Sequence, residues 1–175
     1  MLNGKHVILG ISGGIAAYKS AALIRLLKKN GAEVKVIATR NALKFVTKHT
    51  LETLSQNKLY YELFSECNEY TTEHISLSDW GDIFIVAPAT ANIIGKFASG
   101  IADNALSTSL LAFRGKIFLS PSMNCKMFEN FAVRKNLKYL KENGVDIIEP
   151  PEGFLACGHE GKGRMEEPEG ILSFV

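Results

Sequence analysis

The chain has 175 residues, 46% of them hydrophobic, which is enough to bury the core of one domain. Its 20 basic and 18 acidic residues leave a formal net charge of +2, and no block of like charge suggests a nucleic-acid or membrane surface as the main partner. No apolar stretch approaches the ~18 residues of a membrane span and no signal peptide is recognisable, so we expect a cytoplasmic protein.

In chain order, the first part of the chain predicts a strand, a glycine turn, a helix and a second strand. Residues 5–9 are a short apolar run closed by Gly10, and apolar side chains take up helical spacing over residues 15–29. Two lysines in the last turn and Gly31 beyond it mark the end of this helix, and residues 33–38 supply the second strand. Such a β-α-β unit implies parallel strands and a right-handed crossover.

The same alternation continues to about residue 148. Two nearly continuous apolar strands, "DIFIVAPA" and "KIFLSPS", stop at Pro88 and Pro121 and are typical of central parallel strands. A helix, "NFAVRKNLKYLKENG", and a last strand, "VDIIEPP", follow, whereas residues 150–165 lose all periodicity and are predicted to form a loop. We predict an α/β fold with a doubly wound parallel sheet, in a single domain over residues 1–175.

In open α/β sheets ligands bind beyond the carboxyl ends of the strands, which are followed here by "GISGG", "TRNALKF", "PATAN" and "PSMN". The first loop matches neither G-x-G-x-x-G nor G-K-S/T, and the second strand ends in Thr39 and Arg40 and not in the acidic residue that would hold a ribose diol. A dinucleotide is therefore disfavoured. The glycine turn and the hydroxyl of Ser12 suit a single phosphate, although such turns are often only tight connections.

Hydrogen-bonding side chains also follow two of the buried strands. Thr90 and Asn92 follow one strand, and Ser122 and Asn124 follow the next. They stand where the polar edge of a ring would lie, and core packing does not account for them. Helix capping is the alternative, since Thr, Ser and Asn all favour N-caps.

The three cysteines, Cys67, Cys125 and Cys157, are an odd number at wide spacing, which argues against a disulfide framework. Cys157 and His159 are separated by one residue, which does not match the usual spacing of zinc ligands. We therefore expect thiols and no metal site.

Five motifs spread over nearly the whole chain, "GISGGIAAYK", "EHISLSDW", "PATAN", "PSMNCKMF" and "LACGHEGKGRM", resemble those of the flavin-containing cysteine decarboxylases. They are most similar to the members that act on phosphopantothenoylcysteine. The resemblance implies a flavodoxin-like (Rossmann-like) fold with three α/β/α layers, non-covalently bound FMN, and a trimer or dodecamer with active sites between subunits. The implied FMN contacts are Gly10, Ser12, Gly13, Thr39, Phe45, Ala89, Thr90, Ala91, Asn92, Ser122 and Met123.

The resemblance also implies which residues carry the chemistry. His74 would be the base, Asn124 would bind the substrate carboxylate, and Cys157 would donate a proton. Without the other motifs, His74 would be interpreted as a surface or capping histidine and Cys157 as a small buried hydrophobe. Residues 150–165 would form an active-site lid that is mobile because of its glycines. Further substrate contacts would come from Ala156, Gly158, Lys162 and Arg164.

This chemistry explains the need for a flavin. Direct loss of the carboxyl group from an acylated cysteine would leave a carbanion on Cα without an electron sink, so a cofactor must create one. Hydride transfer from Cβ to the flavin, with loss of the thiol proton to a base, gives a thioaldehyde from which carbon dioxide leaves. Return of the hydride to Cβ and of a proton to Cα gives the aminothiol. The expected reaction is FMN-dependent conversion of 4'-phospho-N-pantothenoylcysteine to 4'-phosphopantetheine in coenzyme A biosynthesis.

Two alternatives stay open: a peptidyl-cysteine oxidative decarboxylase, whose family members lack the lid cysteine, and a non-catalytic flavin-binding regulatory subunit. An FMN prenyltransferase shares the fold but not the histidine, Met-Asn and lid motifs. The chain departs from its relatives at Ser76 and Asp79, where they commonly carry an acidic and a basic residue, and at Phe128, where they often carry a larger or hydroxylated aromatic. The first two departures leave the substrate phosphate without an assigned contact.

In bacteria, such a domain is often the front part of a bifunctional protein. The resemblance therefore implies that residues 1–175 can be the N-terminal part of a longer chain. The second part of that chain would be a phosphopantothenate-cysteine ligase, so a fused or separate ligase is the expected protein partner.

Overall fold

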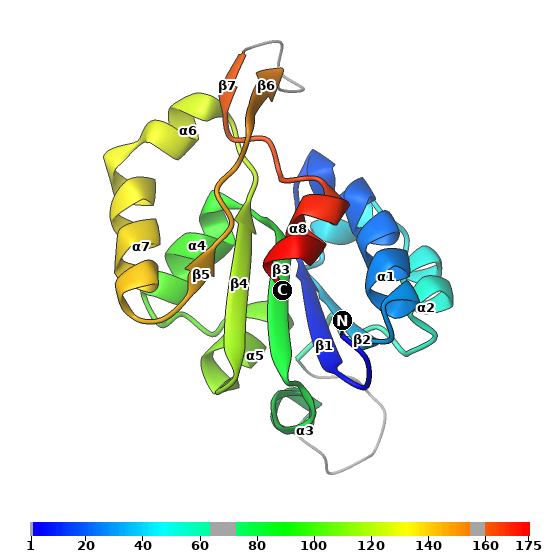
Figure 1. Cartoon of the computed structure of the whole chain (residues 1–175). Helices are drawn as coiled ribbons and strands as arrows, with labels where there is room; N and C mark the ends of the chain where they lie inside the picture. Colours follow the sequence, from blue (N-terminus) through cyan, green and yellow to red (C-terminus); the bar gives the residue numbers. More distant parts are fainter. Residues whose placement is uncertain (1, 64–72, 155–159) are drawn as a thin grey trace.

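The computed structural model describes residues 2–63, 73–154 and 160–175 (Figure 1). A five-stranded parallel sheet with the order β2-β1-β3-β4-β5 lies at its centre. This is the flavodoxin-like strand order, so the predicted doubly wound sheet is confirmed. The strands are β1 (His6–Ile11), β2 (Glu33–Ala38), β3 (Ile83–Ala89), β4 (Lys116–Pro121) and β5 (Asp146–Ile147).

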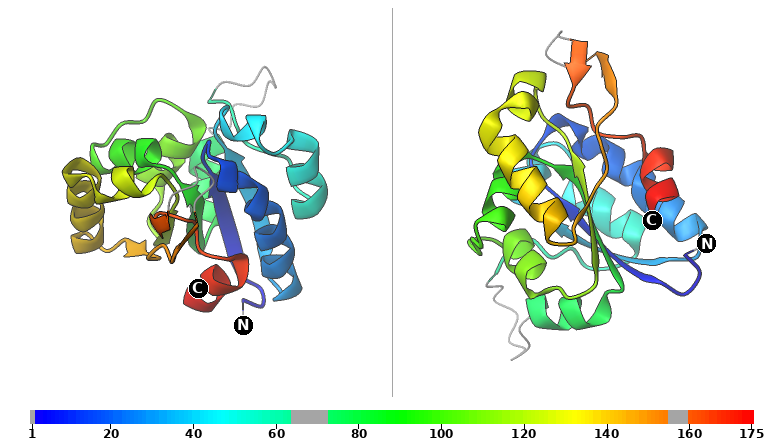
Figure 2. Two further views of the ribbon diagram at one scale, coloured as in Figure 1. Left: turned by 90° about the horizontal axis from the view of Figure 1, so that it is seen from above. Right: turned by 60° about the vertical axis from the view of Figure 1, so that its left-hand side comes forward.

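Helices cover both faces of the sheet and give three layers (Figure 2). One core lies between the sheet and α1 (Lys19–Lys29), α2 (Lys48–Ser55) and α8 (Pro168–Phe174). The other lies between the sheet and α4 (Ala91–Ala98), α5 (Ala105–Ala112), α6 (Cys125–Glu129) and α7 (Phe131–Glu142). The remaining helices are α3 (Glu73–Trp80) and two short 3-10 helices, η1 (Ile15–Tyr18) and η2 (Ala42–Lys44).

The side chains of the central strands alternate between the two cores. In β1, Ile8 belongs to the core beneath α4 and α5, and Leu9 to the core beneath α1. Gly10 lets α5 approach β1 closely, because a β-carbon on it would lie 2.5 Å from Cδ1 of Leu106. The strands are therefore buried on both faces, as their continuous apolar runs predict.

The predicted boundaries hold for most elements. The second strand is confirmed over residues 33–38, and Gly31 follows the first helix with a positive φ of 86°. The first helix differs at its start, because residues 15–18 form η1 before α1 begins at Lys19. The third strand continues to Ala89, one residue beyond Pro88, after a register shift in its pairing with β4.

The segment predicted to be a loop contains an antiparallel pair of strands, β6 (Glu152–Phe154) and β7 (Glu160–Lys162), so that part of the prediction was wrong. Periodicity could not reveal these strands, because each has three residues and Gly153 pairs with Gly161 at the middle of the ladder. The pair projects beyond the carboxyl ends of the strands, next to α6 (Figure 1).

Candidate functional site

The candidate site lies where β1 and β3 run side by side. From β1 the chain crosses to β2 on one side, and from β3 it crosses to β4 on the other. Ligands of open α/β sheets bind at such a switch point, beyond the carboxyl ends of the two strands.

Ser12 joins the two strand ends at this point. Its buried hydroxyl oxygen lies 2.8 Å from the carbonyl oxygen of Pro88 and 3.0 Å from Oγ1 of Thr90, and it accepts the Thr90 N–H at 2.9 Å. Thr90 precedes α4 but makes no capping bond with its own side chain, so its hydroxyl faces Ser12 instead. The hydroxyls after β1 and β3 thus form one hydrogen-bonded unit.

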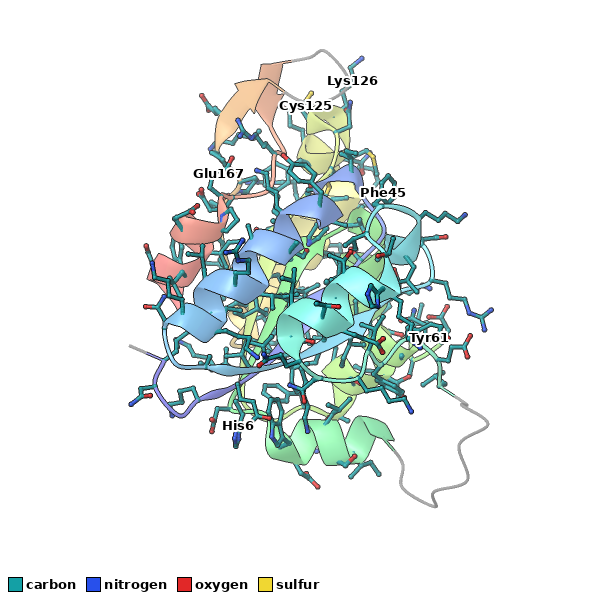
Figure 3. The ribbon with its side chains drawn as sticks, turned by 90° about the vertical axis from the view of Figure 1, so that its right-hand side faces the viewer. His6, Phe45, Tyr61, Cys125, Lys126 and Glu167 are labelled. Carbon is teal, nitrogen blue, oxygen red and sulfur yellow. The ribbon has the colours of Figure 1, made fainter. Side chains whose placement is uncertain are left out.

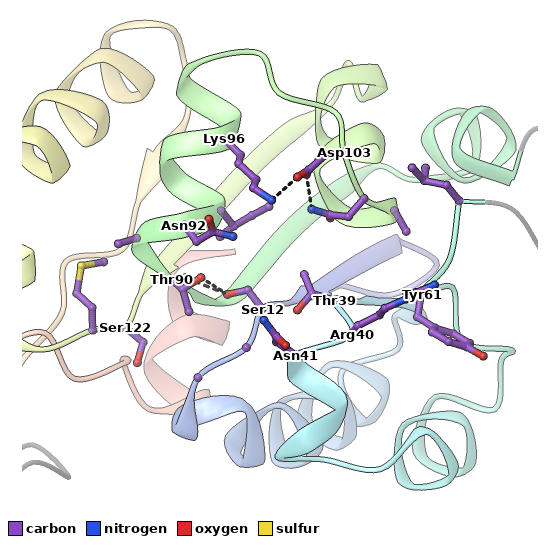
Figure 4. Close-up of a pocket in the computed structure, with 18 of the residues that line it drawn as sticks. Ser12, Thr39, Arg40, Asn41, Tyr61, Thr90, Asn92, Lys96, Asp103 and Ser122 are labelled. Atoms are coloured by element: carbon purple, nitrogen blue, oxygen red, sulfur yellow. Dashed lines mark hydrogen bonds and ion pairs between the residues drawn. The ribbon is translucent and has the colours of Figure 1, made fainter.

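A cavity of about 970 Å³ opens beside this unit (Figure 4). Its walls carry hydroxyl and amide side chains from loops that follow β1, β2, β3 and β4, which is the arrangement that the sequence predicts. Eight of the eleven expected cofactor contacts line it: Ser12, Gly13, Thr39, Thr90, Ala91, Asn92, Ser122 and Met123.

The other three expected contacts lie elsewhere. Gly10 is inside β1, where it makes room for α5, and Ala89 is buried at the end of β3. Phe45 (Figure 3) directly follows η2 and is 45% exposed. None of these three is among the residues that line the cavity in the described part of the chain.

Two ion pairs border the cavity. Lys96 of α4 lies 2.6 Å from Asp103, and Arg40 lies 3.1 Å from Glu62. A hydrogen bond from Lys96, together with the charge of its ammonium, holds the pKa of the Asp103 carboxyl below its ordinary value. Burial raises this pKa, but by less than the hydrogen bond lowers it. Asn104 adds a second contact to this carboxylate, since its Nδ2 donates to Asp103 at 2.8 Å, and the Ser107 hydroxyl adds a third at 3.3 Å.

The expected cofactor contacts did not include Lys96, Asp103 and Asn104. Inspection of the loops after strands misses them, because Lys96 lies inside α4 and the other two lie in the loop between α4 and α5. The available signal was Asn104 followed by Ser107 at capping-box spacing, which places this polar loop at a helix start.

The expected carboxylate ligand, Asn124, is the N-cap of α6. Its Oδ1 accepts the Lys126 N–H at 2.9 Å, as the capping alternative proposes. Asn124 is not among the residues that line the cavity, whereas its neighbour Met123 is. The adjacent residue, Cys125, has a free thiol, and β7 packs against it, because a β-carbon on Gly161 would lie 3.1 Å from Cβ of Cys125.

Of the other expected substrate contacts, Lys162 is exposed on β7, and Arg164 forms an ion pair with Glu167. Ala156, Cys157 and Gly158 lie outside the described residues. His74 is the second residue of α3. Figure 1 places α3 at the end of the sheet opposite to α6 and the β6–β7 pair, so one subunit does not gather all the expected catalytic groups in one place.

The cavity walls fit FMN. Ser12, Thr39 and Thr90 offer hydroxyls, and Asn41 and Asn92 offer amides, which suit a ribityl chain and the polar edge of a flavin ring. Ile93 and Met123 add apolar surface for the ring faces. The close approach of the glycine turn to the loop after β2 leaves no room for a side chain, since a β-carbon on Gly13 would lie 2.5 Å from Cβ of Asn41. Glycine is therefore required here by packing against Asn41, and the short turn that it forms suits a single phosphate.

In the described part of the chain, no three His, Cys, Asp or Glu residues gather as a metal site would require. The helices described there include none with the length and apolar character needed to cross a membrane.

The chain is similar to known proteins over its whole length. A family model described as Flavoprotein matches residues 1–175. The coenzyme A biosynthesis bifunctional protein CoaBC of Bacillus subtilis is 49% identical over 175 residues, which are 100% of this chain and 43% of that protein. The chain thus spans less than half the length of this relative.

Two solved structures share the fold. A PPC decarboxylase with a cysteine-to-serine substitution, complexed with pantothenoylaminoethenethiol, superposes with a TM-score of 0.88 and 32% identity, over 97% of this chain and 95% of that one. The FMN binding protein AtHal3 gives a TM-score of 0.84 and 33% identity, over 97% and 94%.

Proposed function

Because this chain belongs to the Flavoprotein family, we propose that it is an FMN-dependent decarboxylase that converts 4'-phospho-N-pantothenoylcysteine to 4'-phosphopantetheine in coenzyme A biosynthesis. The observation that carries the proposal is the cavity at the β1–β3 switch point, whose hydroxyl and amide walls fit FMN. Similarity to a bifunctional coenzyme A biosynthesis protein and to a PPC decarboxylase supports the substrate.

When bound, FMN would supply a reversible acceptor for the hydride that leaves Cβ of the cysteine moiety. The substrate then becomes a thioaldehyde, from which carbon dioxide can leave. The residues proposed to hold it are Ser12 and Gly13 at the phosphate, and Thr39, Thr90, Asn92 and Met123 along the ribityl chain and ring.

The remaining steps need acid, base and binding groups from the chain. His74 takes the thiol proton as the substrate is oxidised. Asn124 donates its amide hydrogens to the carboxylate and so holds it until carbon dioxide leaves. Cys157 then donates the proton that Cα receives while the hydride returns to Cβ, so the product is the saturated aminothiol.

We also propose a trimer-based oligomer whose sites lie between subunits. The separation of α3 from α6 within one chain supports it, because His74 of one subunit can then serve the cavity of another. Exposed apolar side chains such as Phe131, which is 82% exposed, supply surface for such contacts. By analogy with the bifunctional relative, the expected protein partner is a phosphopantothenate-cysteine ligase, fused or separate, and the absence of a disulfide pattern among the cysteines supports a cytoplasmic location.

A direct test incubates the FMN-loaded chain with phosphopantothenoylcysteine and follows the products by mass spectrometry. We expect loss of one carbon dioxide and formation of phosphopantetheine. A peptide with a C-terminal cysteine is the matched control and should not react. Decarboxylation of the peptide alone would identify a peptidyl-cysteine decarboxylase, and flavin binding without either reaction would identify a regulatory subunit.

A further inference from the structure

Lys19, the first residue of α1, carries a buried ammonium group that the reaction does not use. The residue is 6% exposed, and lysine is rarely so buried unless it is paired. Its Nζ donates to the carbonyl oxygen of Met165 at 3.1 Å and to Oε1 of Glu167 at 2.9 Å. Both partners belong to the segment 163–167, which runs from β7 to α8, so Lys19 attaches this segment to α1.

The other end of the same segment contacts the cavity wall. The Met123 N–H donates to the carbonyl oxygen of Gly163 at 2.9 Å. A β-carbon on Gly163 would lie 2.3 Å from the Met123 carbonyl oxygen, so the two backbones are in direct contact. Met123 lines the cavity, and Asn124, the proposed carboxylate ligand, is the next residue.

Segment 163–167 therefore connects α1 to the loop that follows β4. Lys19 holds it at Met165 and Glu167, and Gly163 contacts Met123 at its other end. Figure 3 shows Glu167 beside the start of α8, and Cys125 where α6 begins next to the β6–β7 pair. A shift of the segment would move the loop that carries Met123.

We propose that Lys19 is a positioning residue for the substrate side of the site: by holding segment 163–167 against α1, it fixes Met123 at the cavity wall and, through it, the adjacent Asn124. The proposal rests on the proposed function in so far as Asn124 binds the substrate. It assigns no contact with FMN to Lys19, whose ammonium is directed to Met165 and Glu167 and not into the cavity.

The chemistry of the two acceptors explains why a lysine is needed. Met165 is fully buried in the apolar core beneath α1 and α8, so its carbonyl oxygen depends on a donor from the protein. The Glu167 side chain is 46% exposed and remains hydrated without Lys19. An ammonium can serve both acceptors because it has three N–H groups. Substitution by methionine fills a similar volume but donates nothing.

The test compares Lys19→Met with Lys28→Met in FMN-loaded protein. Lys28 is the matched control, because it belongs to the same helix and its Nζ also donates to a carbonyl oxygen, that of Ser55 at 2.8 Å, away from the cavity. Hydrogen exchange of the Met123 amide, measured by NMR without substrate, should become about tenfold faster in Lys19→Met. The Leu9 amide in the centre of the sheet should exchange at the parent rate.

Substrate kinetics and cofactor binding give the second readout. In Lys19→Met we expect KM for phosphopantothenoylcysteine to rise about tenfold with a smaller change in kcat, because misplacement of Asn124 weakens binding. The affinity for FMN should stay within about twofold of the parent value. Lys28→Met should match the parent in both measurements.

Three results would overturn the proposal: unchanged exchange at Met123, equal acceleration at Met123 and Leu9, or the same rise in KM in both variants. If Lys19→Met does not fold, Glu167→Ala decides the question, since it keeps the bond to Met165 and should accelerate exchange at Met123 about threefold; no acceleration in that variant overturns the proposal. A parent protein without decarboxylase activity would refute the proposed function alone, because the exchange measurement needs no substrate.

Discussion

Ser12 joins the two halves of the fold through one hydroxyl group. It lies between the carbonyl oxygen of Pro88 and the hydroxyl and N–H groups of Thr90, so it ties the end of β1 to the end of β3. The same oxygen lies at the cavity that we assign to FMN. A change at this residue should therefore affect both stability and cofactor binding.

For Ser12→Ala we predict a loss of about 1–3 kcal/mol in the free energy of unfolding, because the partly buried Thr90 N–H loses its acceptor. We also predict a weaker affinity for FMN, by about tenfold. Ser20→Ala is the control, since its buried hydroxyl donates to the carbonyl oxygen of Ala87 at 2.8 Å and does not reach the cavity. Urea denaturation and FMN titration measure both effects. Equal FMN affinities in the two variants would show that Ser12 is structural only.

Local sequence patterns identify some residues of the site and miss others. Residues directly after buried strands, such as Thr39 and Thr90, were identified because the carboxyl ends of parallel strands meet at one edge of the sheet. Lys96 and Asp103 were not, because no strand end marks them. The partners of Lys19 were also invisible, since Met165 lies 146 positions away in the chain and only the fold brings them together.

At the scale of elements, the sheet and most helices follow from hydrophobic periodicity, and the β6–β7 pair does not. The central strands bury both faces, so their apolar runs are unmistakable. The short β6 and β7 pair through glycines, and β7 lies against α6 where Gly161 meets Cys125, so neither strand has an apolar pattern. Gly163, directly after β7, shows this dependence on backbone contact most clearly.

Gly163→Ala should move the loop after β4. Gly163 has a φ of 141°, and a β-carbon there would lie 2.3 Å from the Met123 carbonyl oxygen. Gly144→Ala is the control for backbone strain alone, because Gly144 also has a positive φ, but a β-carbon on it would meet no heavy atom within 4 Å. We expect Gly163→Ala to lower the free energy of unfolding by about 1–3 kcal/mol more than the control and to raise KM. Thermal unfolding and steady-state kinetics test this, and identical results for both variants would argue against the close contact.

At the scale of the whole molecule, three carboxyl groups among the described residues make stability depend on pH. The His6 N–H lowers the pKa of Asp82, and hydrogen bonds from Lys96 and Lys19 lower the pKa values of Asp103 and Glu167. Each folded pKa lies below its unfolded value, so the folded state binds fewer protons and loses stability as the pH falls.

We therefore predict that the urea midpoint is constant from neutral pH to about pH 5 and falls below it. Asp103→Asn should reduce this dependence on pH, because one of the three groups no longer titrates. Urea unfolding followed by circular dichroism over this pH range measures the effect. A midpoint that rises on acidification would contradict the assigned directions.

The proposed oligomer predicts complementation between two inactive variants. His74→Asn removes the base, so substrate should no longer reduce the flavin although FMN stays bound. Asn124→Asp places like charges together and weakens substrate binding. If sites lie between subunits, co-expression of both variants should restore part of the activity, since some sites then contain one intact copy of each residue. Activity no higher than that of the separate variants, in a mixed oligomer verified by mass spectrometry, would place both residues in one subunit's site.

The central claim is a decarboxylation in which the hydride returns to the product, and anaerobic turnover of the parent and of Cys157→Ser tests it most directly. The parent should convert many equivalents of phosphopantothenoylcysteine to phosphopantetheine and end with oxidised flavin. The serine is a much weaker acid than the cysteine, so the variant should stop after about one equivalent per site, with reduced flavin and an enethiol product. Saturated aminothiol from the variant at the parent rate would exclude Cys157 as the proton donor, and a parent that itself stops at the enethiol would contradict the central claim.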